Sequence, residues 1–353
     1  MGKLSDRYGD DVVSALVRDY GSNPEDTEVK DPTENPFDQI DVRKPITSKD
    51  TTPFTKIFGY QVCETIPDLE FKVYKDSDWH EDARIHIPDL NPNWVWNKPA
   101  LERFALAMHE GDTTLLHGLQ GTGKSCLAEQ WCATLRIPFW RMSCNKETRE
   151  QHFLGSPSLS YDEKGQAHIA QEPTLLTDSL RYGGMFCEDE AFRHNAALVL
   201  QSLRERTNRT VILPDAPGKT AAERLLKAPK NWWYVLTDNT CGSGDETGVF
   251  DAEVQDASTL DRIDTVIEVK YLPKPQERTM LKRMCGLNDD IINGMLDLAK
   301  MVRVAFEKQH IMCTMSVRGL ESWANKIELT GNIGTGLMLS WYNKLGSDDQ
   351  KVV

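Results

Sequence analysis

The residues with the clearest chemical potential lie at 118–125 and could hold the phosphates of a nucleotide. They read Gly-Leu-Gln-Gly-Thr-Gly-Lys-Ser, which matches the phosphate-binding pattern G-x-x-x-x-G-K-[ST]. The backbone N–H groups of such a loop face phosphate oxygens, Lys124 is expected to reach the β and γ phosphates, and Ser125 is expected to ligate Mg²⁺. We therefore expect ATP and Mg²⁺ as cofactors. The predicted nucleotide-binding residues are Gly118, Leu119, Gln120, Gly121, Thr122, Gly123, Lys124, Ser125 and Cys126.

A short apolar segment further along the chain ends in three consecutive acids. Residues 185–187 read Met-Phe-Cys, follow a Gly-Gly pair and precede Glu188, Asp189 and Glu190. We expect Asp189 to hold Mg²⁺ together with Ser125, and Glu190 to polarise the water that attacks the γ phosphate. An acidic surface cluster at the end of a strand is the alternative. The sequence also leaves open whether Glu188 shares the role of either neighbour.

Three further polar residues could act on the nucleotide. Asn239 follows an aromatic and β-branched strand at 232–237, and it would lie near the γ phosphate if this strand runs between those that carry the first two motifs. A buried strand capped by a turn-forming Asp-Asn pair explains the same residues. Arg262 and Arg318, taken singly, are each more typical of a surface salt bridge. A guanidinium nevertheless suits the charge that develops on a transferred phosphoryl group, and it can come from a neighbouring subunit.

The elements that must position these residues follow an α/β pattern. From about residue 85, short apolar runs alternate with longer helical ones, which is the pattern of a parallel sheet flanked by helices. The predicted strands are 113–117, 138–142, 185–187, 233–237 and 265–271. Beyond Pro273 only helical periodicity is found, at 276–284, 289–307 and 317–329. We therefore predict an α/β core with five parallel strands, followed by an all-α C-terminal subdomain.

Composition divides the chain into five segments. The first is acidic and polar, contains an amphipathic stretch at 10–20, and is expected to be a partly disordered arm and linker. A small ordered element, the nucleotide-binding core, a helical lid and a short tail follow. The predicted boundaries of these segments are 1–52, 53–84, 85–272, 273–345 and 346–353.

Charge and cysteine content restrict the partners and the compartment. The chain of 353 residues has 41 basic and 54 acidic residues, and its formal net charge of −13 makes nucleic acid an unlikely partner. No run of about 18 apolar residues occurs and the N-terminus lacks a secretory apolar stretch, so we expect neither a membrane span nor export. The eight cysteines are scattered without a C-x-x-C pair, which argues against a zinc site or disulfides. We expect reduced thiols in a cytoplasmic protein, either bacterial or encoded by a phage.

Several motifs together resemble a known family. The loop at 117–125, the pair Asp189-Glu190, the run at 236–248 and the Leu-Asp-Arg at 260–262 are similar to those of the CobS-type branch of the MoxR-like AAA+ ATPases. That branch is named for a subunit of the aerobic cobaltochelatase. The similarity extends from residue 87 to about residue 324, and the run at 236–248 is its most specific part. The resemblance implies an AAA+ P-loop NTPase fold with a C-terminal lid, assembled into a hexameric ring whose active sites are shared between neighbours.

The resemblance also implies roles for individual residues. Asn239 corresponds to sensor 1, Arg262 to the finger that reaches the nucleotide of the next subunit, and Arg318 to sensor 2. The segment 158–170 is expected to form a hairpin insert near the pore of the ring, and a protein with a metal-dependent von Willebrand A (VWA) domain is the usual partner. The segment 208–230 departs from the family pattern because it is longer and more basic than the usual loop.

These observations predict an ATPase that couples hydrolysis to the remodelling or activation of a protein partner. Two alternatives stay open, the ATPase subunit of a cobalt or magnesium chelatase-type complex and a nucleic-acid motor. A neighbouring gene for a large chelatase subunit would favour the first alternative. Stimulation of ATP turnover by DNA, with a steep salt dependence, would favour the second.

Overall fold

The computed structural model describes most of the chain from residue 51 onwards. The described residues are 51–62, 67–161, 165–194, 197–214, 220–242 and 254–352, together with Ala216 and Gly244. Residues 1–50 of the predicted arm, including the amphipathic stretch at 10–20, lie outside them. Part of the run at 236–248 does too.

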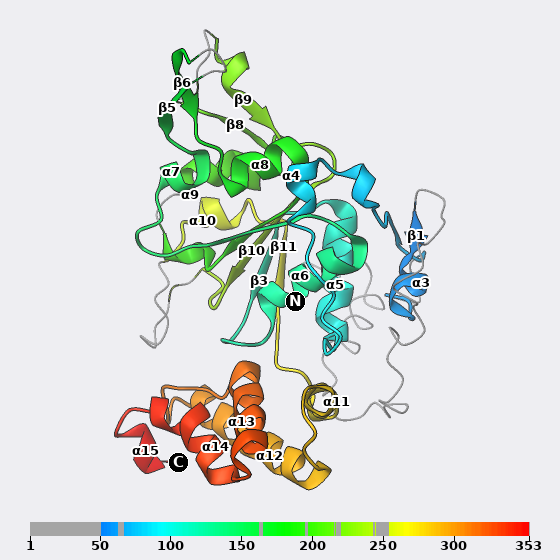
Figure 1. Cartoon of the computed structure of the whole chain (residues 1–353), viewed down its shortest axis with the longest axis vertical. Coiled ribbons are helices and arrows are strands. Elements are labelled where there is room, and N and C mark those ends of the chain that lie inside the picture. The colour runs from blue at the N-terminus through cyan, green and yellow to red at the C-terminus, as the bar shows by residue number, and fades with distance from the viewer. Residues whose placement is uncertain are drawn as a thin grey trace, which may run out of the picture.

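A five-stranded parallel sheet forms the centre of the larger part of the molecule (Figure 1). Its strands are β3 (Thr114–His117), β4 (Phe139–Ser143), β7 (Gly184–Asp189), β10 (Trp232–Asp238) and β11 (Thr265–Glu268). Each overlaps one of the predicted strands, so the predicted five-stranded parallel sheet is confirmed. These segments form strands of a sheet covered on both faces because they are rich in aromatic and branched apolar side chains. Every residue of β7 is buried.

The order of the strands decides which loops meet. From edge to edge the order is β11, β3, β10, β7 and β4, so β10 lies between the strand before the phosphate-binding loop and the strand that carries the acids. In this register Thr237 of β10 lies opposite Leu116 of β3 on one side and Asp189 of β7 on the other. Because the strands are parallel, their carboxyl ends share one edge of the sheet, which is where ligands bind in open α/β sheets.

Helices lie on both sides of this sheet (Figure 1). They are α5 (Lys98–Glu110), α6 (Lys124–Leu135), α7 (Glu150–Leu154), α8 (Leu175–Tyr182), α9 (Ala197–Arg204) and α10 (Ala257–Leu260). The longest of them, α5, begins where the side chain of Asn97 accepts a hydrogen bond from the amide of Ala100, and ends at Gly111 in the left-handed conformation. Its apolar face, which includes Leu101 and Phe104, is fully buried in the main hydrophobic core.

The segment before α5 packs on the same core. It contains β1 (Thr52–Pro53), α3 (Phe54–Phe58), β2 (Glu70–Phe71) and α4 (Glu81–Arg84). The ring of Phe58 stacks on Trp131 of α6 with the ring centroids 5.6 Å apart, and Phe71 meets the same indole edge to face at 4.9 Å. Aromatic pairs of this kind add to the stabilisation that burial provides. The small N-terminal element is therefore attached to the nucleotide-binding core by an aromatic cluster.

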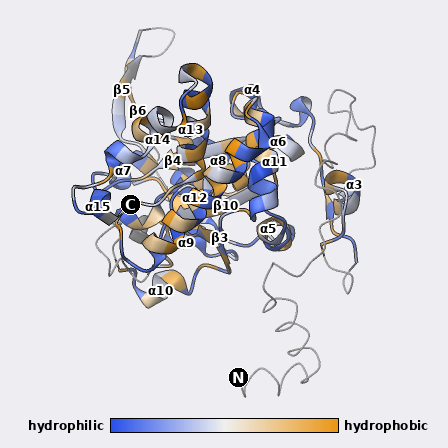
Figure 2. Ribbon diagram, turned by 90° about the horizontal axis from the view of Figure 1, so that it is seen from below, coloured by the Kyte–Doolittle hydropathy of each residue, from blue (hydrophilic) through white to orange (hydrophobic). Residues whose placement is uncertain are grey.

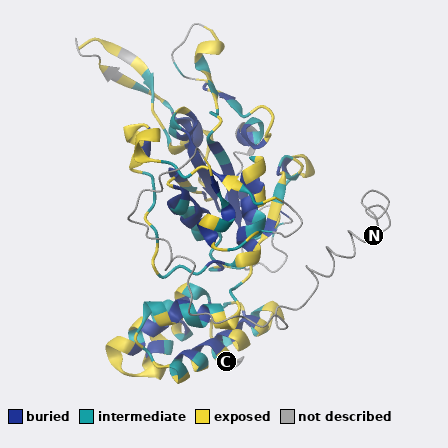
Figure 3. Ribbon diagram, turned by 90° about the vertical axis from the view of Figure 1, so that its right-hand side faces the viewer, coloured by how far each residue is buried: buried dark blue, intermediate teal, exposed yellow. Residues whose placement is uncertain are grey.

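Two antiparallel hairpins project from one end of the core (Figures 1 and 3). One joins β5 (Pro157–Tyr161) to β6 (Ala167–Gln171), and the other joins β8 (Thr210–Ile212) to β9 (Leu225–Lys227). The first occupies the segment for which the resemblance implies a hairpin. The second lies within the segment 208–230, which the sequence analysis treats as a loop.

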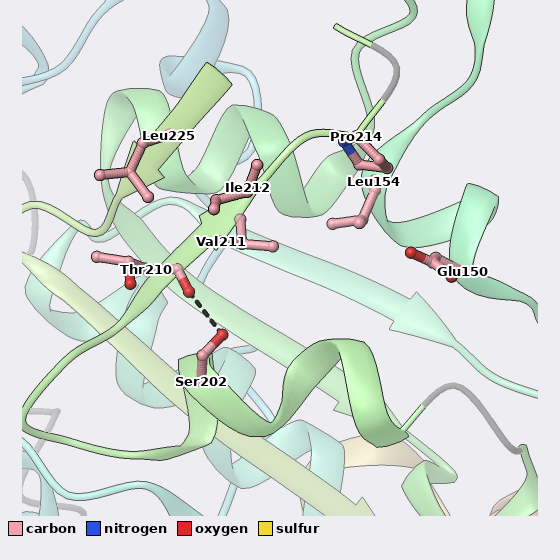
Figure 4. A pocket seen from close by; sticks show the side chains of 8 residues that line it. All are labelled: Glu150, Leu154, Ser202, Thr210, Val211, Ile212, Pro214 and Leu225. Atoms are coloured by element: carbon pink, nitrogen blue, oxygen red, sulfur yellow. Dashed lines mark hydrogen bonds between the residues drawn. The ribbon is translucent and has the colours of Figure 1, made fainter. Parts of the chain in front are cut away.

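A surface groove lies between the β8–β9 hairpin, α7 and α9 (Figure 4). Its volume is about 420 Å³. The lining residues are Glu150, Leu154, Ser202, Thr210, Val211, Ile212, Pro214 and Leu225. Ser202 of α9 donates a hydrogen bond of 2.6 Å to the carbonyl oxygen of Thr210, which ties the hairpin to the helix. The groove includes no residue of the phosphate-binding loop, so it is distinct from the predicted nucleotide site.

The C-terminal helices have a hydrophobic core of their own. They are α11 (Lys274–Met284), α12 (Asp289–Glu307), α13 (Val317–Thr330), α14 (Ile333–Ser340) and α15 (Asp349–Val352). Figure 2 shows hydrophobic and hydrophilic stretches alternating along α12 and α13, and their buried faces include Met295, Leu296 and Trp323. The predicted helices 276–284, 289–307 and 317–329 correspond to α11, α12 and α13. No helix of the described residues combines the length and apolarity needed to cross a bilayer.

Backbone carbonyls of the core hold the C-terminal helices in place. Arg283 of α11 donates to the carbonyl oxygen of Trp94 at 3.2 Å, and the Asn97 side chain donates to that of Lys270 at 3.0 Å, just before α11. The Tyr271 hydroxyl donates to the carbonyl oxygen of Gln120 at 2.7 Å, inside the phosphate-binding loop. Tyr271 lies in the segment that leads into α11, and Ser316 at the start of α13 lies against Gly121, so the helical subdomain touches the loop.

Candidate active site

The loop between β3 and α6 adopts a conformation that depends on glycine. The φ angles of Gly118 and Gly121 are 144° and 73°. A Cβ atom on Gly118 would collide with the carbonyl oxygen of Val269, and one on Gly121 would collide with the side chain of Ser316. No side chain caps the amino end of α6, which begins at Lys124 directly after the loop. Free N–H groups and the positive end of the helix dipole therefore face the loop, an arrangement that fits a phosphate chain.

Lys124 is held across the loop by three oxygen atoms. Its Nζ donates to the carbonyl oxygens of Gly118 at 2.7 Å and Leu119 at 3.0 Å, and to Oδ1 of Asn239 at 2.9 Å. Burial lowers the pKa of Lys124 to about 8, although the charge of Asp238 opposes this shift. The contact with Asn239 joins the end of β10 to the loop after β3. The structure therefore brings these two predicted site residues together.

Ser125 and Asp189 also meet, as the Mg²⁺ prediction requires. Oγ of Ser125 donates to Oδ1 of Asp189 at 2.7 Å, and the hydroxyl of Thr237 donates to the same oxygen. Burial acts to raise the pKa of Asp189, but hydrogen bonds from Thr237, Ser125 and Arg141 outweigh it, so the pKa is lowered. Asp189 is therefore a carboxylate at neutral pH. A hydroxyl beside a carboxylate offers the hard oxygen donors that Mg²⁺ prefers, so these residues fit the ion.

Glu188 lies on the opposite face of β7 from Asp189, because successive side chains of a strand alternate. Its side chain is fully buried, and its two oxygens accept hydrogen bonds of 2.8 Å and 3.0 Å from Nη2 of Arg204. The hydroxyl of Tyr234 donates to it at 2.5 Å, and Nε2 of His194 lies 2.7 Å away. Burial raises the pKa of Glu188, but Arg204 and the hydrogen bonds lower it more, to about 2. Glu188 therefore does not share the position of Asp189 or Glu190.

The same network contains a group of residues that could in principle bind a metal ion. Ligand atoms of Cys144, Glu188 and His194 lie within 4.8 Å of one another. The fully buried guanidinium of Arg204 already neutralises the Glu188 carboxylate, so a metal ion would add uncompensated positive charge away from water. We therefore interpret the group as an ion-pair network that fixes β7 to α9 and to the turn after β7.

Glu190 follows β7 in an unusual backbone conformation. Its φ of 60° and ψ of 46° lie in the left-handed region, which costs a residue with a side chain roughly 1–2 kcal/mol. Strain of this kind is concentrated at functional positions. The side chain is 41% exposed, and Oε2 lies 3.0 Å from Nη1 of Arg193. Its negative charge acts to raise the pKa of Lys124 in the phosphate-binding loop, against the larger effect of burial.

We expect the substitution Glu190→Gln to preserve ATP binding and to lower ATP turnover by about 10²–10⁴-fold, the usual contribution of a positioned general base. The amide keeps the size and polarity of the side chain but cannot accept the proton of the attacking water. Steady-state phosphate release and the binding of a fluorescent ATP analogue measure the two properties separately.

The matched control is Glu188→Gln, the same chemical change one residue earlier. It leaves the buried Arg204 without its counter-charge, so we expect a lower melting temperature, from a loss of up to about 3–5 kcal/mol of stability. Turnover by the folded fraction should stay within severalfold of the native value. Normal turnover in Glu190→Gln combined with a dead but folded Glu188→Gln would reverse the assignment of the two acids.

The two predicted arginines lie in different places. Arg318 lies in the first turn of α13, two residues after Ser316, whose side chain lies against Gly121 of the loop. Arg262 instead donates a hydrogen bond to the carbonyl oxygen of Ser258 in α10. In the views of Figures 1 and 2, α10 lies apart from α6. Arg318 thus belongs to the end of α13 that meets the loop, whereas Arg262 is hydrogen-bonded to α10.

The remaining loop residues stabilise the loop itself. Oγ1 of Thr122 donates to the carbonyl oxygen of Leu119 at 3.0 Å. Cys126 lies half-buried in the first turn of α6, where burial raises the pKa of its thiol. It is one of the seven cysteines in the described part of the chain, where all seven are free thiols.

Two residues at this site were missed by the sequence analysis. Thr237 and Arg141 both bond to the carboxylate of Asp189, from the strands on either side of β7. Nothing in their local sequence distinguishes them, because their role depends on which strands are neighbours. The alternation of side chains along β7, in contrast, could have separated Glu188 from Asp189 in the sequence.

A glycine-rich loop joins β3 to α6, a polar side chain follows the neighbouring strand β10, and acids end β7, the next strand beyond it. These features define a P-loop ATPase. Residues 113–263 match the family model of the AAA domain (dynein-related subfamily), and this part of the chain contains the loop and the acids of an ATPase. The chain is 23% identical over 308 residues to the aerobic cobaltochelatase subunit CobS of Sinorhizobium sp, with 85% of this chain and 89% of CobS covered. The resemblance to CobS-like AAA+ ATPases is therefore confirmed.

Solved structures of similar fold cover about three quarters of the chain. The RuvB Holliday junction branch migration motor of Thermotoga maritima has a TM-score of 0.44 and 13% identity, covering 75% of this chain and 74% of RuvB. A putative ATPase from Cytophaga hutchinsonii ATCC 33406 has a TM-score of 0.39 and 16% identity, covering 77% and 82% of the two chains. These likenesses are too distant to bear on function.

Proposed function

We propose that this ATPase works as a hexameric ring of identical subunits that couples ATP turnover to the remodelling or activation of a protein partner. Each nucleotide would be bound mainly by one subunit and completed by its neighbour. The loop residues 118–126 and Lys124 bind the phosphates, and Ser125 and Asp189 hold Mg²⁺, which when bound neutralises charge on the β and γ phosphates. Glu190 activates the attacking water.

Asn239 and Arg318 complete the site from within the same chain. Asn239 is fixed by its hydrogen bond to Lys124, which places its amide where it can orient the water beside the γ phosphate. Arg318 approaches from α13, so it can respond to the nucleotide and move the helical subdomain with it. This coupling supplies a route from the chemistry of the phosphates to a movement of the protein.

The observation that carries the proposal is the position of Arg262. Arg262 lies two residues after α10 and donates a hydrogen bond back to the Ser258 carbonyl oxygen in that helix, and α10 lies apart from α6 in Figure 1. A guanidinium that stabilises the transferred phosphoryl group can be supplied by a neighbouring subunit. A ring with head-to-tail contacts between identical subunits would deliver Arg262 to the next site at every interface.

The β5–β6 hairpin supports a protein as the partner. Leu159 and Ile169 form a cross-strand pair, and Tyr161 follows two residues after Leu159 on the same face. These three side chains are 64%, 60% and 67% exposed. An apolar face of this kind is unusual on a soluble surface and suits contact with another polypeptide. We propose that it lines the pore of the ring and that a VWA-domain protein is the partner.

The experiment that tests this proposal measures particle mass and turnover together. With Mg²⁺ and a slowly hydrolysed ATP analogue, we expect the full chain to form a particle of about six subunits, since a ring closes with a fixed number of copies. Added VWA-domain protein should bind this particle and raise ATP turnover severalfold. A chain that stays monomeric at saturating nucleotide and hydrolyses ATP at full rate would contradict the ring.

A second candidate function is the ATPase subunit of a metal chelatase, favoured by the similarity to the cobaltochelatase subunit CobS. The two candidates differ in their client. Only the second predicts ATP-dependent insertion of Co²⁺ or Mg²⁺ into a tetrapyrrole when a large chelatase subunit and a VWA subunit are added.

A further inference from the structure

The two oxygens of the Asp189 carboxylate have different kinds of partner. Oδ1 accepts hydrogen bonds from the hydroxyls of Ser125 and Thr237. Oδ2 accepts from Nε of Arg141 at 3.0 Å and also from its Nη2. Neutral hydroxyls therefore occupy one oxygen, and a permanent positive charge occupies the other.

Arg141 reaches this oxygen from the edge of the sheet. It lies in β4, the last strand of the sheet, opposite Cys187 of β7 and two residues before Ser143, which is opposite Asp189. Its side chain is 40% exposed, whereas that of Asp189 is only 10% exposed. A nearly buried acid is thus paired with a guanidinium that solvent can reach.

The Arg141 guanidinium and the predicted Mg²⁺ are two positive charges that compete for the same carboxylate of Asp189. Each oxygen of the carboxylate already accepts two hydrogen bonds, so Mg²⁺ or a water bound to it can reach Oδ2 only in place of the Arg141 contacts. A divalent cation and a guanidinium that share one carboxylate would repel each other strongly in a partly buried site. The ion pair between Arg141 and Asp189 must therefore break, or lengthen, when Mg²⁺ enters.

We propose that Arg141 is a positioning residue that covers the magnesium-facing oxygen of Asp189 and is displaced when Mg²⁺ and ATP bind. This inference rests on the proposed role of Ser125 and Asp189 in holding Mg²⁺. Arg141 keeps the buried carboxylate compensated before the ion arrives, and it sets how much Mg²⁺ is needed to load the site. Its removal makes Mg²⁺ binding easier, whereas loss of a direct phosphate ligand would make nucleotide binding harder.

The test is a Mg²⁺ titration of nucleotide binding, with fluorescent ADP as the probe so that turnover does not enter. The full-length chain, Arg141→Gln and Arg141→Lys are compared from EDTA to saturating Mg²⁺. We expect Arg141→Gln to lower the half-saturating Mg²⁺ concentration by about threefold to fivefold, the scale of a partly exposed ion pair. Arg141→Lys keeps the charge but loses the two-pronged contact, so its value should lie between the other two. Nucleotide affinity in EDTA should not change.

Arg206→Gln is a closely matched control. Arg206 pairs with Asp112 at 2.9 Å, and the two side chains are 48% and 13% exposed, but the pair lies outside the phosphate-binding loop and the acids of β7. Its Mg²⁺ requirement should equal that of the native chain.

An unchanged or higher Mg²⁺ requirement in Arg141→Gln would overturn the proposal, and so would a lower affinity in EDTA, which would make Arg141 a phosphate ligand. If Arg141→Gln does not fold, a native-like Mg²⁺ requirement in Arg141→Lys would still overturn it. Nucleotide binding that ignores Mg²⁺ in the native chain would overturn the Mg²⁺ role of Ser125 and Asp189 as well. That outcome can be distinguished from a failure of the Arg141 proposal alone, because it is measured in the native chain and not in a variant.

Discussion

Lys124→Ala is expected to abolish measurable ATP turnover and to weaken ATP binding by about 100-fold or more. Hydrogen bonds to a charged group are each worth about 1.5–3 kcal/mol, and Lys124 is positioned to make them to two phosphates. Its Nζ is already held at the loop by the carbonyl oxygens of Gly118 and Leu119, so little side-chain freedom is lost when a phosphate arrives. Calorimetric or fluorescent titration with ATP measures the affinity, and phosphate release measures turnover.

The control for this variant is Lys72→Ala, which removes a surface lysine paired with Asp78 at 3.3 Å. It should bind and hydrolyse ATP like the native chain. Thermal unfolding of Lys124→Ala should remain cooperative, since removing the ammonium leaves only backbone carbonyls and Asn239 to be rehydrated. Near-native ATP affinity in Lys124→Ala would show that the nucleotide binds elsewhere.

Arg262→Ala is expected to lower turnover by at least about 10³-fold while leaving ATP affinity within severalfold of the native value. A guanidinium supplied to the transition state is worth about 10³–10⁵ in rate, and in the proposed ring it comes from the neighbouring subunit. The side chain contacts only the Ser258 carbonyl among the hydrogen bonds of the described residues, so its removal should hardly affect the fold. Turnover per subunit, measured over a wide range of protein concentration, is the readout.

Arg224→Ala is a fitting control, because Arg224 also bonds to a backbone carbonyl, that of Pro214 at 3.0 Å, but lies at the β8–β9 hairpin. The ATP turnover of Arg224→Ala should equal that of the native chain. In the native chain, turnover per subunit should rise with concentration as rings assemble. If turnover per subunit is independent of protein concentration and unchanged in Arg262→Ala, Arg262 does not act as the finger.

Much of the fold could be predicted because its signals are local. The strand β10 is rich in aromatic and β-branched residues, and the loop at 118–125 contains glycines in conformations that other residues rarely adopt. The helices α12 and α13 have clear apolar faces. In α14, by contrast, Gly334, Gly336 and several apolar residues give no such periodicity, so the helix was missed. The β8–β9 hairpin was missed because its short strands lie in a polar, basic segment.

The residues of the active site could be predicted only in part from local sequence patterns. Lys124, Ser125 and Asp189 were recognisable from motif spacing, and the structure brings them together as the motifs predict. The contacts of Thr237 and Arg141 with Asp189 depend on the strand order, which no local pattern encodes. The burial of Glu188 against Arg204 likewise pairs residues from separate elements. Sequence therefore indicates the reacting groups better than it indicates the side chains that hold them.

The most direct test of the shared active site mixes two inactive variants, Lys124→Ala and Arg262→Ala. In a mixed ring, the intact loop of an Arg262→Ala subunit can lie beside the intact Arg262 of a Lys124→Ala subunit, which restores a complete site. Random mixing in equal amounts should recover about a quarter of native turnover, since one interface in four then has both intact parts. Turnover that stays at the sum of the two separate variants, in particles shown to contain both, would contradict a site shared between subunits.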